Sequence, residues 1–469
     1  MATESEQPIR KLGSMKTVTL PVQEALGIVA ALEASGRRDF ASSLNERVLA
    51  DAPDNPEALH HKAVSLTRSG DDASAACLLE RAIANSLPQV HHFRNLCAIY
   101  ERLGRLQEAL AAGKRAVALD ETDAESYHNL TVVHARCLDL DSALACARRA
   151  LSLDPLRAGA HLALAEALLM RGEFIEGWEE YEWRFRLAGV TPVVPHPGKP
   201  QWDGQPFSDG KLLLVGDQGF GDVIQFARYI PWAQSRCPDI LVASAPEMRH
   251  LLAQLAPSAQ IVGEWESCPP YRAYVPLSGL PRLHGTNAEN IPAPGPYLQA
   301  APDRIAFWRD RLSALVPDGY RRIGLVWAGR ATHPNDRNRS MKLMQLAPLL
   351  DRSKIAFIAL QKGPAAAQIA GHHGRAPLIN LGASISNFEE AAAALHALDC
   401  LITVDTSMAH LAGALGRPAW VMLPFAPDWR WLLARSDTPW YPSLRLFRQP
   451  QQGDWAGVIT QIMDALGLH

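Results

Sequence analysis

The sequence predicts an α-helical repeat array followed by an α/β region that contains parallel sheets. Three observations support this fold class: a 34-residue repeat in the first third of the chain, a proline-rich break near residue 200, and short apolar runs that alternate with helical patterns after the break. Repeated helix pairs bury their apolar faces by stacking, whereas strands that alternate with helices form parallel sheets. A chain of 469 residues is expected to hold two or three domains.

Small residues recur every 34 positions in the first third of the chain. The first register contains glycine with one leucine, and the other two contain mainly alanine: Gly36, Gly70, Gly104, Leu138 and Gly172; Ala41, Ala75, Ala109, Ala143 and Gly177; Ala82, Ala116 and Ala150. Small side chains let two antiparallel helices approach closely, and glycine closes the turn between them. The pattern resembles the tetratricopeptide repeat over residues 21–187, which implies a groove for a peptide or protein. A spacer or a dimerisation surface is the alternative.

Histidines and cysteines give no sequence signal for a metal site. Five of the histidines in the repeats show no paired carboxylates in the sequence, namely His60, His61, His91, His92 and His128. We expect them to line the groove or to be solvated. The seven cysteines form no CxxC pair, so they are interpreted as small core or surface residues.

The repeat period stops at a proline-rich segment, residues 191–206. A second proline-rich stretch, 292–302, parts two series of apolar runs. The sequence therefore predicts five regions: a disordered N-terminus (1–20), repeats (21–187), a linker (188–206), a first Rossmann-like lobe (207–302) and a second one (303–469).

The apolar runs after the break predict buried parallel strands. They cover residues 211–215, 240–243 and 274–277 in the first series, and 323–327, 355–360, 378–381, 400–404 and 420–423 in the second. A helix is predicted over 223–235. Two Rossmann-like lobes facing a cleft are expected, with the ligand site beyond the carboxyl ends of the strands.

A glycine-rich turn follows the first predicted strand, and it reads Gly216-Asp217-Gln218-Gly219-Phe220-Gly221-Asp222. Such a turn leaves helix N–H groups free to meet a ligand. Asp222, at the expected helix start, is a candidate general base for an acceptor hydroxyl. A helix-capping role explains the same residue equally well. Asp217 is the rival candidate base and is less favoured, because it lies closer to the strand.

A second motif follows the strand that ends at Val404. Asp405, Thr406 and Ser407 open a helix that stops at Gly416. Free N–H groups and the two hydroxyls suit a diphosphate. His410 lies one turn inside this apolar helix, where a hydrogen-bonded core histidine is the competing interpretation.

Cations follow two other strands of the second series. A polar loop carries Arg330, Arg337 and Arg339, and Lys362 comes after the next strand. Arginine binds phosphate oxygens in a bidentate way, although a solvated charged loop fits the pattern as well. The segment 425–431, Phe-Ala-Pro-Asp-Trp-Arg-Trp, is expected either to pack on the base or sugar or to close the structure where the last helices cross between lobes.

Two of these motifs resemble those of the heptosyltransferase-like glycosyltransferases. Gly219-Phe-Gly221-Asp222-Val-Ile-Gln225 is similar to the N-lobe motif of that family, and the segment 405–418 is similar to its C-lobe donor motif. The resemblance covers about residues 200–465. It implies the GT-B fold and an inverting reaction without metal or other cofactor, in which the C-terminal lobe binds a nucleotide-sugar.

Carried over to this chain, the resemblance makes Asp222 the base and places Thr406 and Ser407 in the phosphate loop. Ser407 stands where the family usually has glycine, so the donor loop is expected to differ in shape. The family's lysine after the first strand of the second lobe is not evident, and Arg337 and Arg339 are its candidate replacements.

Repeats fused to such a unit resemble the layout of protein O-glycosyltransferases, including bacterial flagellin glycosyltransferases. The resemblance implies transfer to a Ser or Thr hydroxyl of a protein held by the repeats, with flagellin as one candidate. A lipopolysaccharide or glycan acceptor, and an inactive unit in a protein-interaction scaffold, are the alternatives. A net charge of −3 gives no case for nucleic acid, and no apolar run predicts a membrane span. The cytoplasm is the expected location, and homo-oligomerisation is left open.

Overall fold

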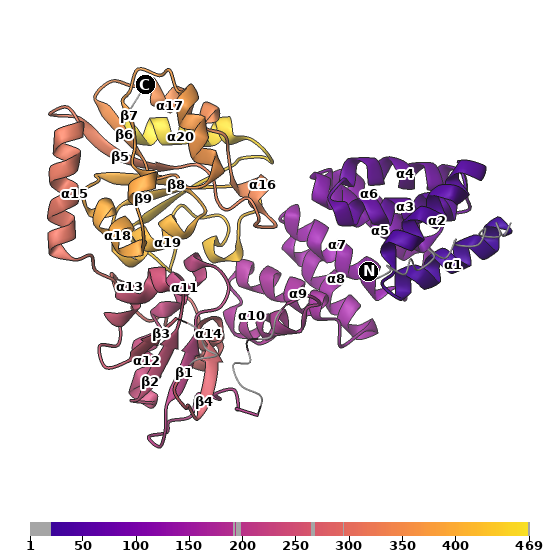
Figure 1. Cartoon of the computed structure of the whole chain (residues 1–469), viewed down its shortest axis with the longest axis horizontal. Helices are drawn as coiled ribbons and strands as arrows, with labels where there is room; N and C mark the ends of the chain where they lie inside the picture. The colour runs from indigo at the N-terminus through magenta and orange to yellow at the C-terminus, as the bar shows by residue number, and fades with distance from the viewer. Residues whose placement is uncertain (1–19, 191–192, 194–197, 264–267, 294, 468–469) are drawn as a thin grey trace, which may run out of the picture. The chain divides into compact units, whose positions relative to one another are not determined.

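The computed structural model describes residues 20–190, 193, 198–263, 268–293 and 295–467 (Figure 1). Contacts divide the chain into two compact units, Met1–Val133 and His134–His469. The predicted disordered N-terminus lies outside the described residues, apart from Leu20. Among the described helices, none has the length and apolar character needed to cross a membrane.

The first unit consists of antiparallel helix pairs. Its helices are α1 (Val22–Ala34), α2 (Arg38–Asp51), α3 (Pro56–Ser69), α4 (Asp72–Ala84), α5 (Val90–Leu103), α6 (Leu106–Leu119) and most of α7 (Ala124–Arg136). Each helix from α2 to α6 packs on the one before it. The predicted small residues lie in these interfaces, since Ala75, Ala82 and Ala109 are fully buried.

The 34-residue period is kept along the whole repeat region. Helix pairs begin at Val22, Pro56, Val90, Ala124 and Ala158, each 34 residues after the one before. The turn inside every pair holds the predicted glycine register in the left-handed conformation, with φ between 76° and 89°. Leu138 adopts it too, with φ 60°, although this conformation costs a non-glycine residue roughly 1–2 kcal/mol. The prediction of tetratricopeptide-like helical repeats is confirmed.

The last repeat helices belong to the second unit: α8 (Leu140–Leu153), α9 (Ala158–Arg171) and α10 (Phe174–Tyr181). Trp178 of α10 is buried, and its indole N–H donates to the Thr286 carbonyl at 3.0 Å. Its ring meets Trp429 edge-on, with centroids 5.2 Å apart. The repeat pattern therefore runs on past the compact boundary at 133/134. The expected linker does not divide the units, because α10 is part of the α/β core.

Two parallel sheets make up the rest of the second unit. The first has the order β3-β2-β1-β4 and contains β1 (Leu212–Val215), β2 (Ile240–Ala243), β3 (Gln260–Val262) and β4 (Ala273–Pro276). The second has the order β10-β9-β8-β5-β6-β7 and contains β5 (Arg321–Val326), β6 (Ile355–Ala359), β7 (Leu378–Asn380), β8 (Cys400–Val404), β9 (Ala419–Leu423) and β10 (Leu444–Arg448). The strand order of the second sheet changes direction between β5 and β8, which is where open parallel sheets bind ligands.

Helices connect these strands, and Figure 1 shows the two sheets as separate groups. They are α11 (Phe220–Ala227), α12 (Ile230–Arg236), α13 (Arg249–Ala253), α14 (Leu280–His284), α15 (Pro302–Leu315), α16 (Asp336–Arg339), α17 (Ala347–Leu350), α18 (Phe388–His396), α19 (Ser407–Ala414) and α20 (Trp455–Leu466). Helix α11 packs on α19, and α13 packs on α18. Helices that follow strands of the first sheet therefore contact helices that follow strands of the second sheet.

Three local predictions differ from the structure. The single helix expected over 223–235 is two helices, α11 and α12, and the first of them starts earlier than expected, at Phe220. The helix is interrupted because Pro231 lacks the N–H that would continue α11. Strands β3 and β10 were not predicted, and both lie at sheet edges. Within the expected linker, Trp202 donates its backbone N–H to Tyr274 of β4 at 2.7 Å.

We predict that a chain beginning at Thr122, which keeps α7 whole, stays soluble and unfolds cooperatively. A chain beginning at Gly189 should aggregate, because it exposes the apolar surface that Phe174, Trp178 and Tyr181 cover. Size-exclusion chromatography and thermal melts of the two truncated chains test this. Equal solubility of both would show that α8–α10 are not part of the core.

Candidate functional site

A cavity of about 530 Å³ lies at the carboxyl ends of strands from both sheets. Its wall contains segments that follow β1 and β2 of the first sheet, and β5, β6, β8 and β9 of the second. Asp222 and Thr406, predicted at two different strand ends, line the same cavity. Val326 and Asp405 place it at the switch in strand order between β5 and β8.

Three helix N-termini line this cavity. Helices α11, α18 and α19 contribute their first residues, Phe220, Phe388 and Ser407. A helix start carries about half a positive charge and unpaired N–H groups, so it favours anions. Arg339 and Lys362 line the same cavity. Together these groups suit a ligand that carries several negatively charged oxygens.

Asp222 is the third residue of α11 rather than a residue that precedes the helix. One carboxylate oxygen accepts a hydrogen bond from the Gly219 N–H at 2.9 Å. The other oxygen forms an ion pair with Arg430. Asp222 therefore stabilises the helix start, as the capping interpretation expects, and its side chain also forms part of the cavity wall.

Arg430 joins three polar groups. Its Nη1 donates to both oxygens of Asp428 at 2.9 and 3.0 Å, its Nε donates to the Gln225 side-chain oxygen at 2.6 Å, and its Nη2 reaches Asp222. The residue is 7% exposed. A buried guanidinium needs such partners, so this network connects the segment after β9 with α11.

The segment 425–431 lies partly in the core and partly on the cavity wall. Trp429 and Trp431 are buried in the core, whereas Asp428 and Arg430 line the cavity. The sequence analysis did not single out Arg430. The charged residues Asp428 and Arg430, set beside tryptophans, were the available signal, because a charge in an apolar segment needs a partner when it is buried.

Two residues predicted for the site lie behind the cavity. Gln225 is fully buried and holds Arg430. Asp217 accepts hydrogen bonds from the N–H of Ser278 at 3.1 Å and from its hydroxyl. Burial raises the pKa of Asp217, and its carboxylate is not among the lining groups. The rival base thus fixes the turn after β4 and has no access to a ligand.

The glycine motif brings α11 and α19 into contact. A Cβ on Gly221 would lie 2.9 Å from Cδ2 of His410. The tight turn depends on Gln218, with φ 64°, rather than on Gly219 or Gly221. The expected glycine turn is therefore wrong in detail: Gly221 is required for helix packing.

His410 is both a core residue and part of the cavity wall. Its Nδ1 lies 3.0 Å from the Tyr441 hydroxyl. Burial lowers the pKa of His410 to about 3, so the ring is neutral at pH 7. The core interpretation explains the hydrogen bond, and the neutral ring adds no positive charge to the cavity.

The segment after β8 has its own helix cap. Thr406 is the N-cap of α19, and its hydroxyl accepts from the Met408 N–H at 3.3 Å. Asp405 is 8% exposed. Burial raises the pKa of Asp405 to about 6, and the Asp428 carboxylate is the second cause. Ionisation of Asp405 therefore costs free energy, and its carboxylate lies beside a helix start that favours anions.

The predicted cations separate into two groups. Arg330, Arg339 and Lys362 line the cavity. The ammonium of Lys362 donates to the Ile385 carbonyl at 2.6 Å, which holds the side chain at the edge of α18. Arg337 is exposed and is not a lining residue of the cavity.

Comparison with known proteins gives one sequence relative for part of the chain. No family model matches. Protein FlbA of Caulobacter vibrioides is 28% identical over 335 residues, which cover 65% of this chain and 54% of that protein. The chain thus spans about half the length of this curated relative.

Solved structures match about a third of the chain. They include MamA (21% identity, 34% of this chain and 93% of that one, TM-score 0.30) and TTC0263, a tetratricopeptide protein of Thermus thermophilus (27%, 36% and 92%, TM-score 0.31). YrrB, described as a tetratricopeptide protein with an unusual peptide-binding site, covers 35% of this chain and 86% of its own (17% identity, TM-score 0.30). The repeat assignment rests on the 34-residue register.

Gly221→Ala is expected to destabilise the second unit by about 1–3 kcal/mol, because the new methyl group meets His410 at 2.9 Å. Denaturant unfolding measures the change. The matched control is Gly263→Ala, where nothing lies within 4 Å of the new Cβ. In a double-mutant cycle, His410→Ala should reduce the cost of Gly221→Ala; strict additivity would contradict the contact.

Asp405→Asn is expected to stabilise the protein at neutral pH. The folded pKa of about 6 exceeds the ordinary 3.8, so ionisation costs stability as the pH rises between these values. At about 1.4 kcal/mol per pKa unit, the gain at pH 7.5 should be roughly 1–3 kcal/mol and should shrink toward pH 4. Unfolding of this variant and of the exposed control Asp318→Asn, measured from pH 4 to 8, tests this. A gain that does not depend on pH would contradict it.

Proposed function

We propose that this chain is a glycosyltransferase with a GT-B arrangement, which transfers a sugar from a nucleotide-sugar to a protein hydroxyl. The observation that supports the proposal is the single cavity that collects strand ends from two parallel sheets and the starts of three helices. Its volume falls in the usual range for small-molecule sites, roughly 300–1,000 Å³. The resemblance of the 219–225 and 405–418 segments to glycosyltransferase motifs supplies the reaction class.

The donor diphosphate would bind at the start of α19. Thr406 and Ser407 bring backbone N–H groups to the cavity, and Arg339 and Lys362 bring positive charge. During transfer, the bond between the sugar's anomeric carbon and the diphosphate breaks, and negative charge builds up on the leaving oxygen. Fixed N–H dipoles and cations stabilise that charge.

Asp222 is the proposed base for the acceptor hydroxyl. Both of its oxygens have partners in the absence of substrate, so the oxygen paired with Arg430 has to exchange its partner for the acceptor O–H. Arg430 keeps Asp428 as a bidentate partner during this exchange. The acceptor oxygen then attacks the anomeric carbon from the side opposite the diphosphate, and its proton passes to Asp222.

The repeats would supply the acceptor protein. Stacked helix pairs commonly offer an extended surface for peptides, which favours a protein acceptor, such as flagellin, over a glycan. A second candidate function is a nucleotide-binding scaffold without transferase activity. The observation that favours it is the engagement of both Asp222 oxygens, together with Ser407 in place of the usual glycine.

Nucleoside diphosphates should raise the melting temperature of the chain. Arg339→Gln should weaken the binding of the nucleoside diphosphate that binds most tightly by roughly tenfold or more, because a charged hydrogen-bond donor is lost. Arg337→Gln, two residues away on α16 and outside the cavity wall, is the matched control and should stay within about twofold. Calorimetric titration gives both affinities. Equal losses in the two variants would place the nucleotide elsewhere.

Asp222→Asn is expected to lower turnover by roughly a hundredfold or more with donor affinity nearly unchanged, because the amide still accepts the Gly219 N–H but takes no proton. Release of nucleoside diphosphate in the presence of acceptor measures this, with Asp217→Asn as the control carboxylate outside the cavity wall. Retained turnover in Asp222→Asn would remove it as the base. Donor binding without turnover by the unaltered chain, over a panel of protein and glycan acceptors, would favour the scaffold.

A further inference from the structure

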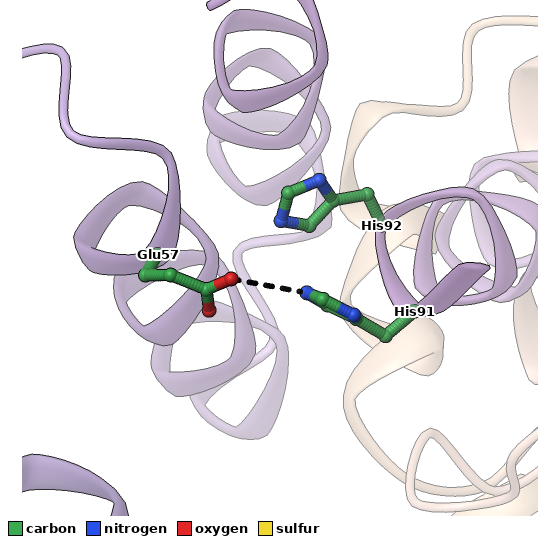
Figure 2. Close-up of side chains that lie close together, drawn as sticks. All are labelled: Glu57, His91 and His92. Atoms are coloured by element: carbon green, nitrogen blue, oxygen red, sulfur yellow. Dashed lines mark ion pairs between the residues drawn. The ribbon is translucent and has the colours of Figure 1, made fainter. Parts of the chain in front are cut away.

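A compact group of metal-ligating side chains lies in the first unit, outside the α/β cavity. It contains Glu57 on α3 and the adjacent His91 and His92 at the start of α5. One ligating atom of each residue lies within 4.8 Å of those of the other two. Figure 2 shows the two imidazole rings on one side of a gap and the Glu57 carboxylate on the other.

The sequence analysis expected these histidines to lack carboxylate partners, and that expectation is wrong. His91 Nε2 lies 3.7 Å from Glu57 Oε1, and His61 Nδ1 lies 3.3 Å from Glu33 Oε2. Glu57 and His91 are 34 residues apart, so they hold equivalent positions in neighbouring repeats. Stacking of the repeats is what brings them together.

His92 gives a second, independent indication of a ligand. Its side chain is fully buried, and neither ring nitrogen has a hydrogen-bond partner among the described residues. An unsatisfied buried polar group costs about 1–3 kcal/mol, and such groups are uncommon in folded proteins. The 3.7 Å separation of His91 Nε2 from Glu57 is also too long for a hydrogen bond. A bound cation would satisfy both rings at once.

A third imidazole adjoins the group. His60 lies three residues after Glu57 on α3, and its ring centroid is 4.7 Å from that of His91 and 5.3 Å from that of His92. Its Nε2 lies 2.8 Å from the side-chain nitrogen of Asn95. The Asn95 side-chain N–H donates to this ring nitrogen and orients the His60 ring beside the group.

We propose that Glu57, His91 and His92 bind one divalent transition-metal ion of the zinc class. Imidazole nitrogens with one carboxylate suit zinc and its neighbours, whereas Mg²⁺ and Ca²⁺ prefer sites made wholly of oxygen. Ligand atoms in a tetrahedral zinc site are about 3.3 Å apart, so separations of up to 4.8 Å in the observed group have to shorten by at most about 1.5 Å. Side-chain rotation at the partly exposed Glu57 and His91 provides that movement.

A bound ion would link the second repeat to the third and stabilise the repeat surface, independently of the reaction proposed for the second unit.

Calorimetric titration of the chelator-treated full chain with ZnCl₂ tests the proposal. One saturable site per chain is expected, and Glu57→Gln and His91→Gln should each weaken binding at least tenfold. His373→Gln removes an exposed imidazole of the second unit and should leave the affinity unchanged. No saturable binding, or equal affinity in all three variants and the unaltered chain, would overturn the proposal.

Cobalt supplies a readout that does not depend on how well the variants fold. Co²⁺ bound to the unaltered chain should give the intense visible absorption of four-coordinate nitrogen and oxygen ligation, and one equivalent of Zn²⁺ should remove it. The weak spectrum of octahedral Co²⁺ would overturn the assignment. Far-UV circular dichroism of the metal-free variants establishes that a lost affinity reports the site rather than unfolding.

Discussion

The ion pairs of the buried Arg430 guanidinium are the interaction on which the second unit depends most. The guanidinium lies between two carboxylates that follow strands of different sheets, Asp222 after β1 and Asp428 after β9. It also donates a hydrogen bond to the side-chain oxygen of Gln225. Removing one partner of a buried ion pair leaves an uncompensated charge, which typically costs about 3–5 kcal/mol. The same contacts hold α11 against the segment after β9 and so join the two sheets beside the cavity. Any account of activity has to include this ion pair, because the proposed base takes part in it.

Much of the fold could be predicted because it follows from short-range rules. The register of Gly36, Gly70, Gly104 and Gly172 marks turns with positive φ, and Leu138 keeps the register in spite of its strain. Strands such as Ile240–Ala243 and Cys400–Val404 are continuous apolar runs, as expected of buried parallel strands. Strands β3 and β10 were missed, since Gln260, Arg445 and Arg448 interrupt their apolar runs. The compact boundary at 133/134 was also missed, because it depends on the long-range packing of Trp178.

The candidate site was predictable by strand end but not by side chain. Sequence position placed Asp222, Thr406, Arg339 and Lys362 after strands, and the structure places all four on one cavity. Sequence position could not show that Arg339 lines the cavity and that Arg337 does not, because both residues lie on the same short helix. It also could not show that Asp217 and Gln225 lie behind the cavity wall. The Glu57–His91 contact had a signal in the repeat period itself, because residues one repeat apart become neighbours when helices stack.

A crystal structure of the chain with a bound nucleoside diphosphate tests the central claim most directly. The account predicts phosphate oxygens within hydrogen-bond distance of the backbone N–H groups at Thr406 and Ser407, with Arg339 alongside and the Arg430–Asp428 pair intact. A nucleotide found in the first unit, or on the outer face of either sheet with the cavity empty, would contradict it.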